Sequence, residues 1–205
     1  MPKVSEEFLL ARREEIIDAC ATLYQTMSFK DITIKEIGKV TSFNRTSIYN
    51  YFNTKEEIFL ALMQREYMLW VEELKTLTET NETMSGEELA DALALTLAKR
   101  ERLLKLLSMN HFDMEENSSI ENLTEFKKSY GATFDAVERC LKKFFPALTD
   151  KDRENFLYAF FPFVYGIYPY GAVTEKQSKA MKAAGLNFVP HSIYELAHNF
   201  ILKLL

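Results

Sequence analysis

The segment from Thr33 to Lys55 constrains the fold of this 205-residue chain more than any other feature. Thr33 is followed three residues later by Glu36, a pattern in which the hydroxyl and the carboxylate cap the first turn of a helix reciprocally. After a short interruption, Asn44 provides the N-cap of a second helix. The segment therefore predicts two short helices joined by a tight turn.

The second of these helices has one apolar and one polar face. At about 100° per residue, Ile48 and Phe52 share the apolar face, whereas Thr46 and Asn50 point the opposite way. The alternative interpretation, an amphipathic helix pair with a solvated face, normally places Glu and Lys outward, yet residues 44–53 include no acidic residue. Hydrogen-bonding side chains without acidic neighbours suit phosphate oxygens and base edges. The pattern favours a helix-turn-helix that docks on DNA.

The side chains predicted to contact DNA lie on the exposed sides of these helices and at the start of a third. Thr54 and Glu57 form a further capping box, which presents Lys55 and free backbone N–H groups to a phosphate. The predicted DNA contacts are Thr33, Lys35, Asn44, Arg45, Thr46, Ser47, Tyr49, Asn50, Tyr51 and Lys55.

The segments TIKEI (33–37) and NRTSIYNYFNTK (44–55) resemble the DNA-binding part of the tetracycline-repressor (TetR) family. The resemblance covers about residues 8 to 63, because the apolar pattern of residues 13–29 also fits that family's first helix. It implies a regulator whose remaining helices bind a small molecule and form a dimer interface. Ser28 and Ser42 stand where the family usually has Gly, which predicts local strain of about 1 kcal/mol at each left-handed residue.

The charge of the chain is unevenly distributed. The formal net charge is −5, but residues 28–55 hold five basic and two acidic residues, a local charge of +3, and the remainder, with 20 basic and 28 acidic residues, carries −8. A phosphate responds to charges within a Debye length of about 10 Å. This distribution favours site-specific DNA binding, because the acidic remainder disfavours nonspecific attachment.

Capping signals recur along the chain, Gly and Pro are scarce, and strand-type alternation is hard to find. We therefore predict an all-α fold of about nine helices. Residues 1–53 form an N-terminal three-helix helix-turn-helix domain, and residues 54–205 form a larger C-terminal helical domain for effector binding and dimerisation. Beyond the first domain, the predicted helices are 54–80, 85–109, 118–145, 149–170, 175–184 and 191–204, with polar loops at 110–117 and 185–190.

Aromatic residues concentrate between Phe156 and Tyr170, which hold eight of the 27 in the chain. Eight rings are too many for one helix face, so we expect some to line a cavity and others to face a second subunit; an aromatic core without a cavity is the alternative. The expected effector is an unknown small apolar or aromatic molecule. The predicted pocket residues are Met63, Tyr67, Trp70, Met109, Phe112, Tyr130, Phe161 and Tyr165.

A homodimer is expected on physical grounds. One recognition helix gains only about 1 to 3 kcal/mol of discrimination per good bidentate base contact. Two such helices, about 34 to 36 Å apart on a palindromic double-stranded operator, double that gain. The apolar terminal helix is the candidate interface. Its predicted interface residues are Ile193, Leu196, Ala197, Phe200, Ile201 and Leu204.

Membrane and metal sites have little support in the sequence. Residues 156–173 carry no charge over nearly a bilayer's thickness, but Pro162, Gly166 and four tyrosines interrupt them, so we predict no membrane span. The first ten residues lack a signal-peptide pattern, which favours a cytoplasmic protein with Cys20 and Cys140 as core thiols.

One loop is rich in potential metal ligands, but the spacing of these residues fits no helix face. Those residues are His111, Asp113, Glu115 and Glu116; we predict no metal and no cofactor.

These observations together predict a DNA-binding transcriptional regulator, a ligand-responsive repressor acting as a homodimer. Two alternatives remain open. The first is a DNA-tethered protein-interaction factor without a small-molecule effector. The second is an all-helical enzyme, for which the sequence shows no Gly-rich phosphate loop, nucleophile motif or other catalytic residues.

Overall fold

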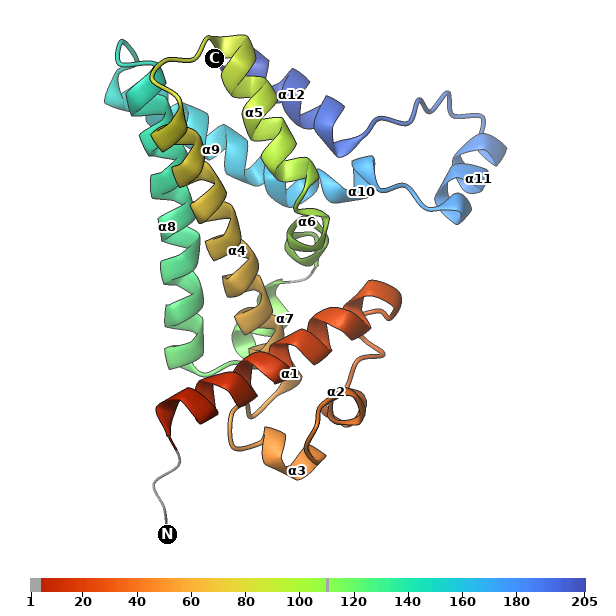
Figure 1. The fold of residues 1–205 in the computed structure, drawn as a ribbon. Helices are drawn as coiled ribbons and strands as arrows, with labels where there is room; N and C mark the ends of the chain where they lie inside the picture. Colours follow the sequence, from red (N-terminus) through yellow and green to blue (C-terminus); the bar gives the residue numbers. More distant parts are fainter. Residues whose placement is uncertain (1–4, 110) are drawn as a thin grey trace. The chain divides into compact units, whose positions relative to one another are not determined.

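The computed structural model describes residues 5–109 and 111–205, except for the side chains of residues 111–113 (Figure 1). All regular secondary structure within these residues is α-helical, which confirms the predicted fold class. The helices are α1 (Glu6–Thr26), α2 (Ile34–Val40), α3 (Arg45–Ile48), α4 (Lys55–Thr80), α5 (Gly86–Ala98), α6 (Glu101–Leu107), α7 (His111–Glu116), α8 (Ile120–Phe144), α9 (Asp150–Gly166), α10 (Tyr168–Gly171), α11 (Glu175–Ala183) and α12 (Ile193–Leu204).

The chain forms two compact units. The first, here called the head, comprises Met1–Arg65 and Asn110–Ser129, and the second, the body, comprises Glu66–Met109 and Tyr130–Leu205. The long helices α4 and α8 each contribute residues to both units. The domain boundary predicted between residues 53 and 54 stays a prediction, although the first turns of α4 belong to the head.

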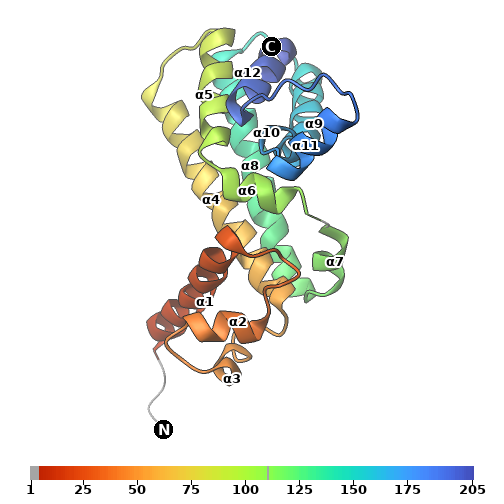
Figure 2. The same cartoon turned by 90° about the vertical axis from the view of Figure 1, so that its right-hand side faces the viewer.

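The head is built on the buried face of α1. Ile16, Ile17 and Cys20 are essentially inaccessible to solvent. Tyr24 meets the ring of Phe59 from α4 edge-on, with centroids 5.3 Å apart. The helices α2 and α3 contact each other and lie to the right of α1 in Figure 2. The apolar face of α1 and the start of α4 thus form the core on which the two short helices rest.

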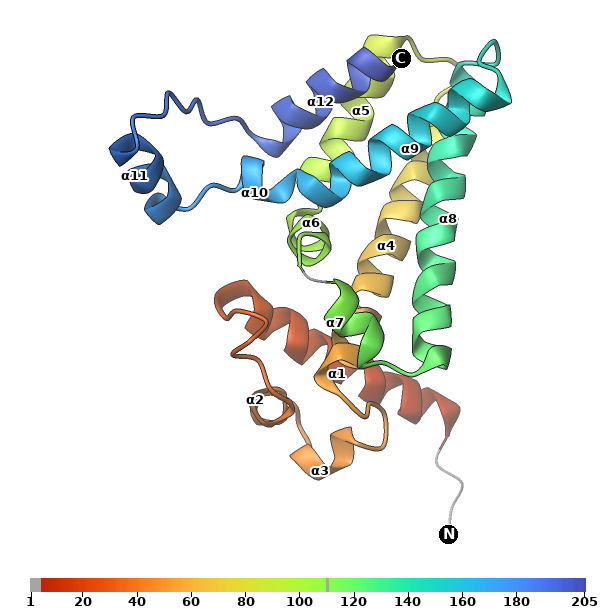
Figure 3. The ribbon, with the colours of Figure 1, turned by 180° about the vertical axis from the view of Figure 1, so that it is seen from behind.

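The body packs around aromatic residues. The fully buried Trp70 lies against Phe160 and Phe161, with centroids 6.3 Å from each, and its indole Nε1 donates to Thr96 Oγ1 at 3.0 Å. Within the body α8 lies beside α4, where Tyr67 and Tyr130 meet with centroids 6.0 Å apart. The terminal helix α12 runs along α5 (Figure 3). An aromatic cluster is therefore flanked by the α5–α12 pair, to which Trp70 is bonded through Thr96.

Two helices that the sequence predicted to be continuous are each divided in the structure, so these predictions are wrong. The helix predicted at 85–109 breaks into α5 and α6 at Arg100, whose backbone leaves the helical region with a ψ of 37°. Its Nη2 donates to the Leu69 carbonyl and to Glu73, each at 2.9 Å. The helix predicted at 149–170 divides at Ile167, and α10 begins with Pro169 in its first turn, where the missing N–H is tolerated.

Two further predictions about α7 and α8 are wrong. The loop predicted at 110–117 contains helix α7, and α8 begins two residues later than expected. Ser119 accepts the Asn122 N–H at 3.2 Å, whereas Ser118 donates to the Met114 carbonyl. These differences bring the described helices to twelve.

The predicted strain at Ser28 and Ser42 is also wrong. Among the residues that the structure describes, Gly185 alone has a positive φ, of 72°. Ser28 forms its turn in ordinary backbone geometry, with its carbonyl accepting the N–H groups of Asp31 and Ile32. Neither turn therefore needs the left-handed residue that Gly supplies.

Within the described part of the chain, no helix combines the length and apolar character that a membrane span requires. The buried cysteines also fit the prediction of core thiols. Burial raises the pKa of the Cys20 thiol to about 12 and that of Cys140 to about 11. Both thiols are therefore protonated and unreactive.

Candidate functional site

Helix α3 exposes a polar face because its apolar face is anchored in the head. Ile48 and Phe52 are 0% and 1% exposed, which confirms the predicted apolar face. Arg45 Nη2 donates to Tyr49 Oη at 3.2 Å, and the guanidinium keeps further donors for a ligand. Helix α3 ends at Ile48, earlier than the predicted helix, which extended to Phe52, and a turn follows it. The exposed side of α3 and of this turn carries Arg45, Thr46, Tyr49 and Asn50.

Several other predicted contact residues also serve as helix caps. Asn44 Oδ1 accepts the backbone N–H and the hydroxyl of Ser47, both at 3.0 Å. Thr33 Oγ1 accepts the Glu36 N–H at 3.2 Å, but the Glu36 carboxylate pairs with Lys39 and does not complete the predicted capping box. These caps fix where α2 and α3 begin.

Gly38 permits the close approach of α2 and α3. A Cβ built at this position would lie 3.1 Å from Arg45 Cα and 3.2 Å from its Cβ. Sequence reasoning missed this residue, because only the tertiary crossing of the two helices makes the missing side chain necessary.

The turn between α2 and α3 is held by α1. A carboxylate oxygen of Glu15 accepts the Ser42 N–H, and Arg12 Nη1 donates to Ser42 Oγ at 2.7 Å. The Arg12 guanidinium also lies 4.4 Å from the centroid of the Phe43 ring. The hydrogen bonds from Ser42 lower the pKa of Glu15. Charged side chains of α1 therefore fix the turn that positions α3.

Lys55, predicted to contact a phosphate, is held by contacts within the head. Its ammonium donates to the Phe29 carbonyl at 2.8 Å and lies 4.2 Å from the centroid of the Phe29 ring. The side chain is half-buried. Its ammonium therefore contacts the loop after α1 in this structure.

Glu57 is a buried carboxylate at the start of α4, with 2% exposure. It accepts the N–H of Asn53 at 2.7 Å and that of Ser119 at 3.2 Å, so it does not close the capping box predicted with Thr54. Burial by itself would raise the pKa of Glu57, but hydrogen bonds from Asn53, Asn122 and Ser119 together lower it. One carboxylate thus joins the end of the α3 region to the start of α8 within the head.

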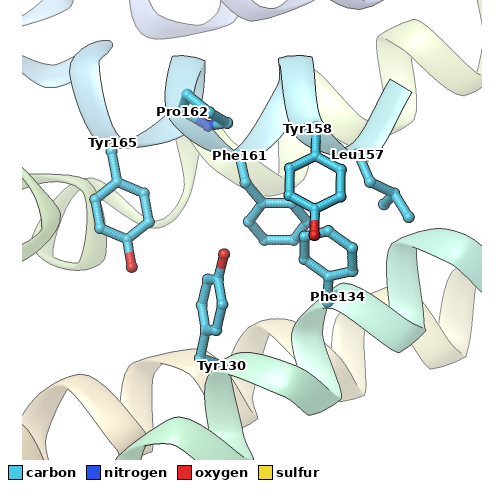
Figure 4. A pocket seen from close by; sticks show the side chains of 7 residues that line it. All are labelled: Tyr130, Phe134, Leu157, Tyr158, Phe161, Pro162 and Tyr165. Carbon is cyan, nitrogen blue, oxygen red and sulfur yellow. The ribbon is translucent and has the colours of Figure 1, made fainter. Parts of the chain in front are cut away.

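The body contains an open aromatic groove of about 480 Å³ between α8 and α9 (Figure 4). Three predicted pocket residues, Tyr130, Phe161 and Tyr165, line it. Sequence reasoning missed the others, whose aromatic or apolar character alone does not separate groove from core. The lining residues are Tyr130, Phe134, Leu157, Tyr158, Phe161, Pro162 and Tyr165.

The other predicted pocket residues do not line this groove. Tyr67 is fully buried, with its hydroxyl 3.1 Å from that of Tyr165, and Trp70 is a core residue. Met63 is fully buried and belongs to the head, and Met109 is half-buried. The side chain of Phe112 lies outside the described residues.

For two residues of α12 the predicted place in the dimer interface is wrong. Ala197 and Ile201 are fully buried within their own chain, because α12 packs along α5. Phe200 stacks on Phe163 of α9, with centroids 3.9 Å apart. The remaining predicted interface residues are half-buried, namely Ile193, Leu196, Phe200 and Leu204.

Among the described residues, no three His, Cys, Asp or Glu side chains come together in a way that would hold a metal ion. The side chains of His111 and Asp113, two members of the ligand-rich segment noted in the sequence, lie outside the described residues. Glu115 pairs with Lys127 at 2.5 Å.

Solved structures share this fold. FadR, a fatty acid degradation regulator from Bacillus halodurans, has a TM-score of 0.60 at 16% identity and aligns over 99% of this chain and 96% of its own. A TetR/AcrR regulator from Thermobifida fusca has a TM-score of 0.61 at 17% identity, over 95% of this chain and 96% of its own. At these identities the likeness concerns the fold alone.

Curated relatives match about a third of this chain. The HTH-type transcriptional repressor Rv1474c of Mycobacterium tuberculosis is 30% identical over 66 residues, 32% of this chain and 35% of the relative. The uncharacterised HTH-type regulator YfiR of Bacillus subtilis is 32% identical over 63 residues, 31% of each chain. This chain thus matches only about a third of the length of these relatives.

Family models match most of the chain. The model of bacterial regulatory proteins of the tetR family matches residues 16–62, and the model of the tetracyclin repressor-like C-terminal domain matches residues 64–195. The second model alone covers more than half of the sequence. The chain therefore belongs to the TetR family of transcriptional regulators and not to a family of enzymes, as its sequence motif predicted.

Proposed function

We propose that this protein is a repressor that binds a palindromic DNA operator as a homodimer and leaves it when a small apolar or aromatic effector binds the body. The observation that carries the proposal is the exposed side of α3 and of the turn after it. There Arg45, Thr46 and Asn50 are exposed, while Ile48 and Phe52 are buried. The local positive charge and the absence of acidic residues from this face suit a polyanion.

The head is suited to read base edges because its backbone is fixed before DNA arrives. Glu15 and Arg12 hold the turn at Ser42, and Asn44 caps α3. A preorganised surface loses less conformational freedom on binding. We assign base contacts to Arg45 and Asn50, whose side chains match guanine and adenine edges in the major groove.

Homodimerisation is proposed through the outer surface of α12. Leu196, Phe200 and Leu204 keep accessible apolar area, and Leu202 is 39% exposed. The stack of Phe200 on Phe163 extends this surface onto α9. A two-fold axis through such a surface would present two heads to two half-sites.

Effector control is proposed to act through the helices that contribute to both units. FadR structures from Bacillus subtilis and Thermus thermophilus contain stearoyl-CoA and lauroyl-CoA, so proteins of similar fold take ligands with apolar chains. Emptying an almost fully occupied operator requires about 5.5 kcal/mol of differential affinity. In this chain α4 contributes residues to both units, so it can transmit the effect of the ligand to the head. We place the protein in the cytoplasm, where it has access to DNA.

The test is a gel-shift series at several salt concentrations with the promoter fragment of the protein's own gene and a random duplex. We expect Arg45→Ala to weaken promoter binding by about 1 to 3 kcal/mol and to reduce the preference over random DNA. Arg139→Ala, at an exposed position on α8 in the body, is the matched control. Equal, salt-sensitive binding of the wild-type protein to both duplexes would overturn the proposal.

A further inference from the structure

The groove between α8 and α9 has flat apolar walls. The rings of Phe134 and Phe161 stack with centroids 4.6 Å apart and an interplanar angle of 19°. Tyr158 meets Phe134 edge-on at 5.8 Å and is 68% exposed, so it forms the open side. Leu157 and Pro162 complete the apolar lining. This shape suits a flat or narrow apolar group.

One end of the groove is polar. In Figure 4 the Tyr130 ring rises from α8 with its hydroxyl directed toward α9, and the Tyr165 hydroxyl is directed toward α8. The two rings meet edge-on with centroids 6.4 Å apart. Tyr165 is engaged from the buried side by Tyr67, at 3.1 Å between the hydroxyl oxygens. Within the described part of the chain, the Tyr130 hydroxyl makes no hydrogen bond.

The groove is also electrically neutral. None of its seven lining residues carries a charge. Burial raises the pKa of the Tyr67 and Tyr130 phenols, so both stay protonated at neutral pH. A carboxylate or ammonium brought into this lining would lose hydration without gaining a counter-charge, whereas a carbonyl oxygen would gain a phenolic donor.

We propose that this groove binds a flat apolar molecule bearing one uncharged hydrogen-bond acceptor, such as an aryl ketone or aldehyde, with the Tyr130 hydroxyl as the donor. The inference rests on the proposed function, because it names the chemical class of the effector. The neutral groove would bind acids and amines of the same shape less tightly. The competing occupant is the side chain of a second copy of this protein.

Four naphthalenes of matched shape test the proposal by equilibrium dialysis without DNA. The probes are naphthalene, 2-acetylnaphthalene, 2-naphthoate and 2-naphthylmethylammonium. We expect 2-acetylnaphthalene to bind roughly tenfold or more tightly than either charged probe. Tyr130→Phe should weaken 2-acetylnaphthalene binding about five- to tenfold and leave naphthalene unchanged. Tyr170→Phe, at a position that is 68% exposed and outside the groove lining, is the matched control.

Three outcomes overturn the proposal. Either charged probe could bind as well as the ketone. Tyr130→Phe could weaken all probes alike. Finally, no probe could bind while Phe134→Asp dissociates a dimer in native mass spectrometry, which would make the groove a subunit contact. Gel shifts on the same samples distinguish this proposal from the proposed function. Operator binding without probe binding rejects the ligand class but not the repressor function. Specific probe binding without operator binding supports the ligand class and rejects the repressor function.

Discussion

The turn that positions α3 in the head and the interior of the body are held by different kinds of contact. In the head, charged side chains reach across the structure to backbone or hydroxyl groups, as Glu15 and Arg12 do at Ser42 and Glu57 does at Asn53. In the body, the interior is a set of rings in edge-on and stacked contact around Trp70. Hydrogen bonds to charged groups are directional, whereas ring contacts tolerate several geometries.

This difference fits the two tasks proposed for the protein. A surface that reads base edges must hold its helix in one orientation, and directional bonds at the turn and at both ends of α3 do so. A site for an apolar effector must adapt its walls. Stacked rings without polar atoms, such as Phe134 and Phe161 in the groove, allow small displacements. The comparison predicts that single substitutions in the two units have distinguishable consequences.

The largest effect is expected from Trp70→Ala. The indole is fully buried, packs on Phe160 and Phe161, and donates to Thr96. Its removal leaves a cavity and takes one donor from the Thr96 hydroxyl, which still donates to the Leu93 carbonyl. We expect the free energy of unfolding to fall by about 3 to 5 kcal/mol. Urea unfolding followed by circular dichroism measures the loss. The exposed Tyr158→Ala provides a control near zero, and a loss below about 1 kcal/mol for Trp70→Ala would contradict an aromatic core.

A smaller and pH-dependent effect is expected from Glu57→Gln. The pKa of folded Glu57 lies below its ordinary value of 4.5, so its stabilisation is fully present above that value and is lost as the pH falls through the folded pKa. At pH 7 we expect the variant to lose about 2 kcal/mol, the typical worth of hydrogen bonds to a charged group. The deficit should shrink toward pH 3.

Urea unfolding at pH 7 and at low pH measures this difference, and Glu56→Gln is the matched control on the same turn. A deficit that persists unchanged at low pH would show that the carboxylate's charge does not hold Asn53 and Ser119. The head would then depend on packing as the body does, and the contrast between the two units would fail.

Sequence reasoning succeeded where the determinants are local. The caps at Thr33 and Asn44 and the spacing of Ile48 and Phe52 lie within single turns, so the sequence predicted the starts of α2 and α3 and the buried face of α3. Local periodicity did not show that Glu15 holds Ser42, since 27 residues separate them and only the packed head brings them together.

The candidate ligand and dimer surfaces were harder to predict for a related reason. An apolar stripe looks the same in sequence whether it faces a helix of its own chain, a ligand or a second subunit. Ala197 and Ile201 therefore fitted an interface until the packing of α12 along α5 showed them to be buried. Likewise, ring content alone did not separate Trp70 in the core from Phe134 in the groove.

The smallest effect is expected at Lys55, where the sequence and the structure imply different roles. Lys55→Met keeps the apolar stem but removes the ammonium from the Phe29 carbonyl and ring. If this contact is the main role, unfolding becomes easier by about 1 kcal/mol, while the salt dependence of DNA binding keeps its slope. If Lys55 instead meets a phosphate, stability is unchanged and the slope falls by about 1. Measuring both quantities on one preparation, with Lys35→Met as the exposed control on α2, decides whether this cation belongs to the frame of the head or to its DNA-binding surface.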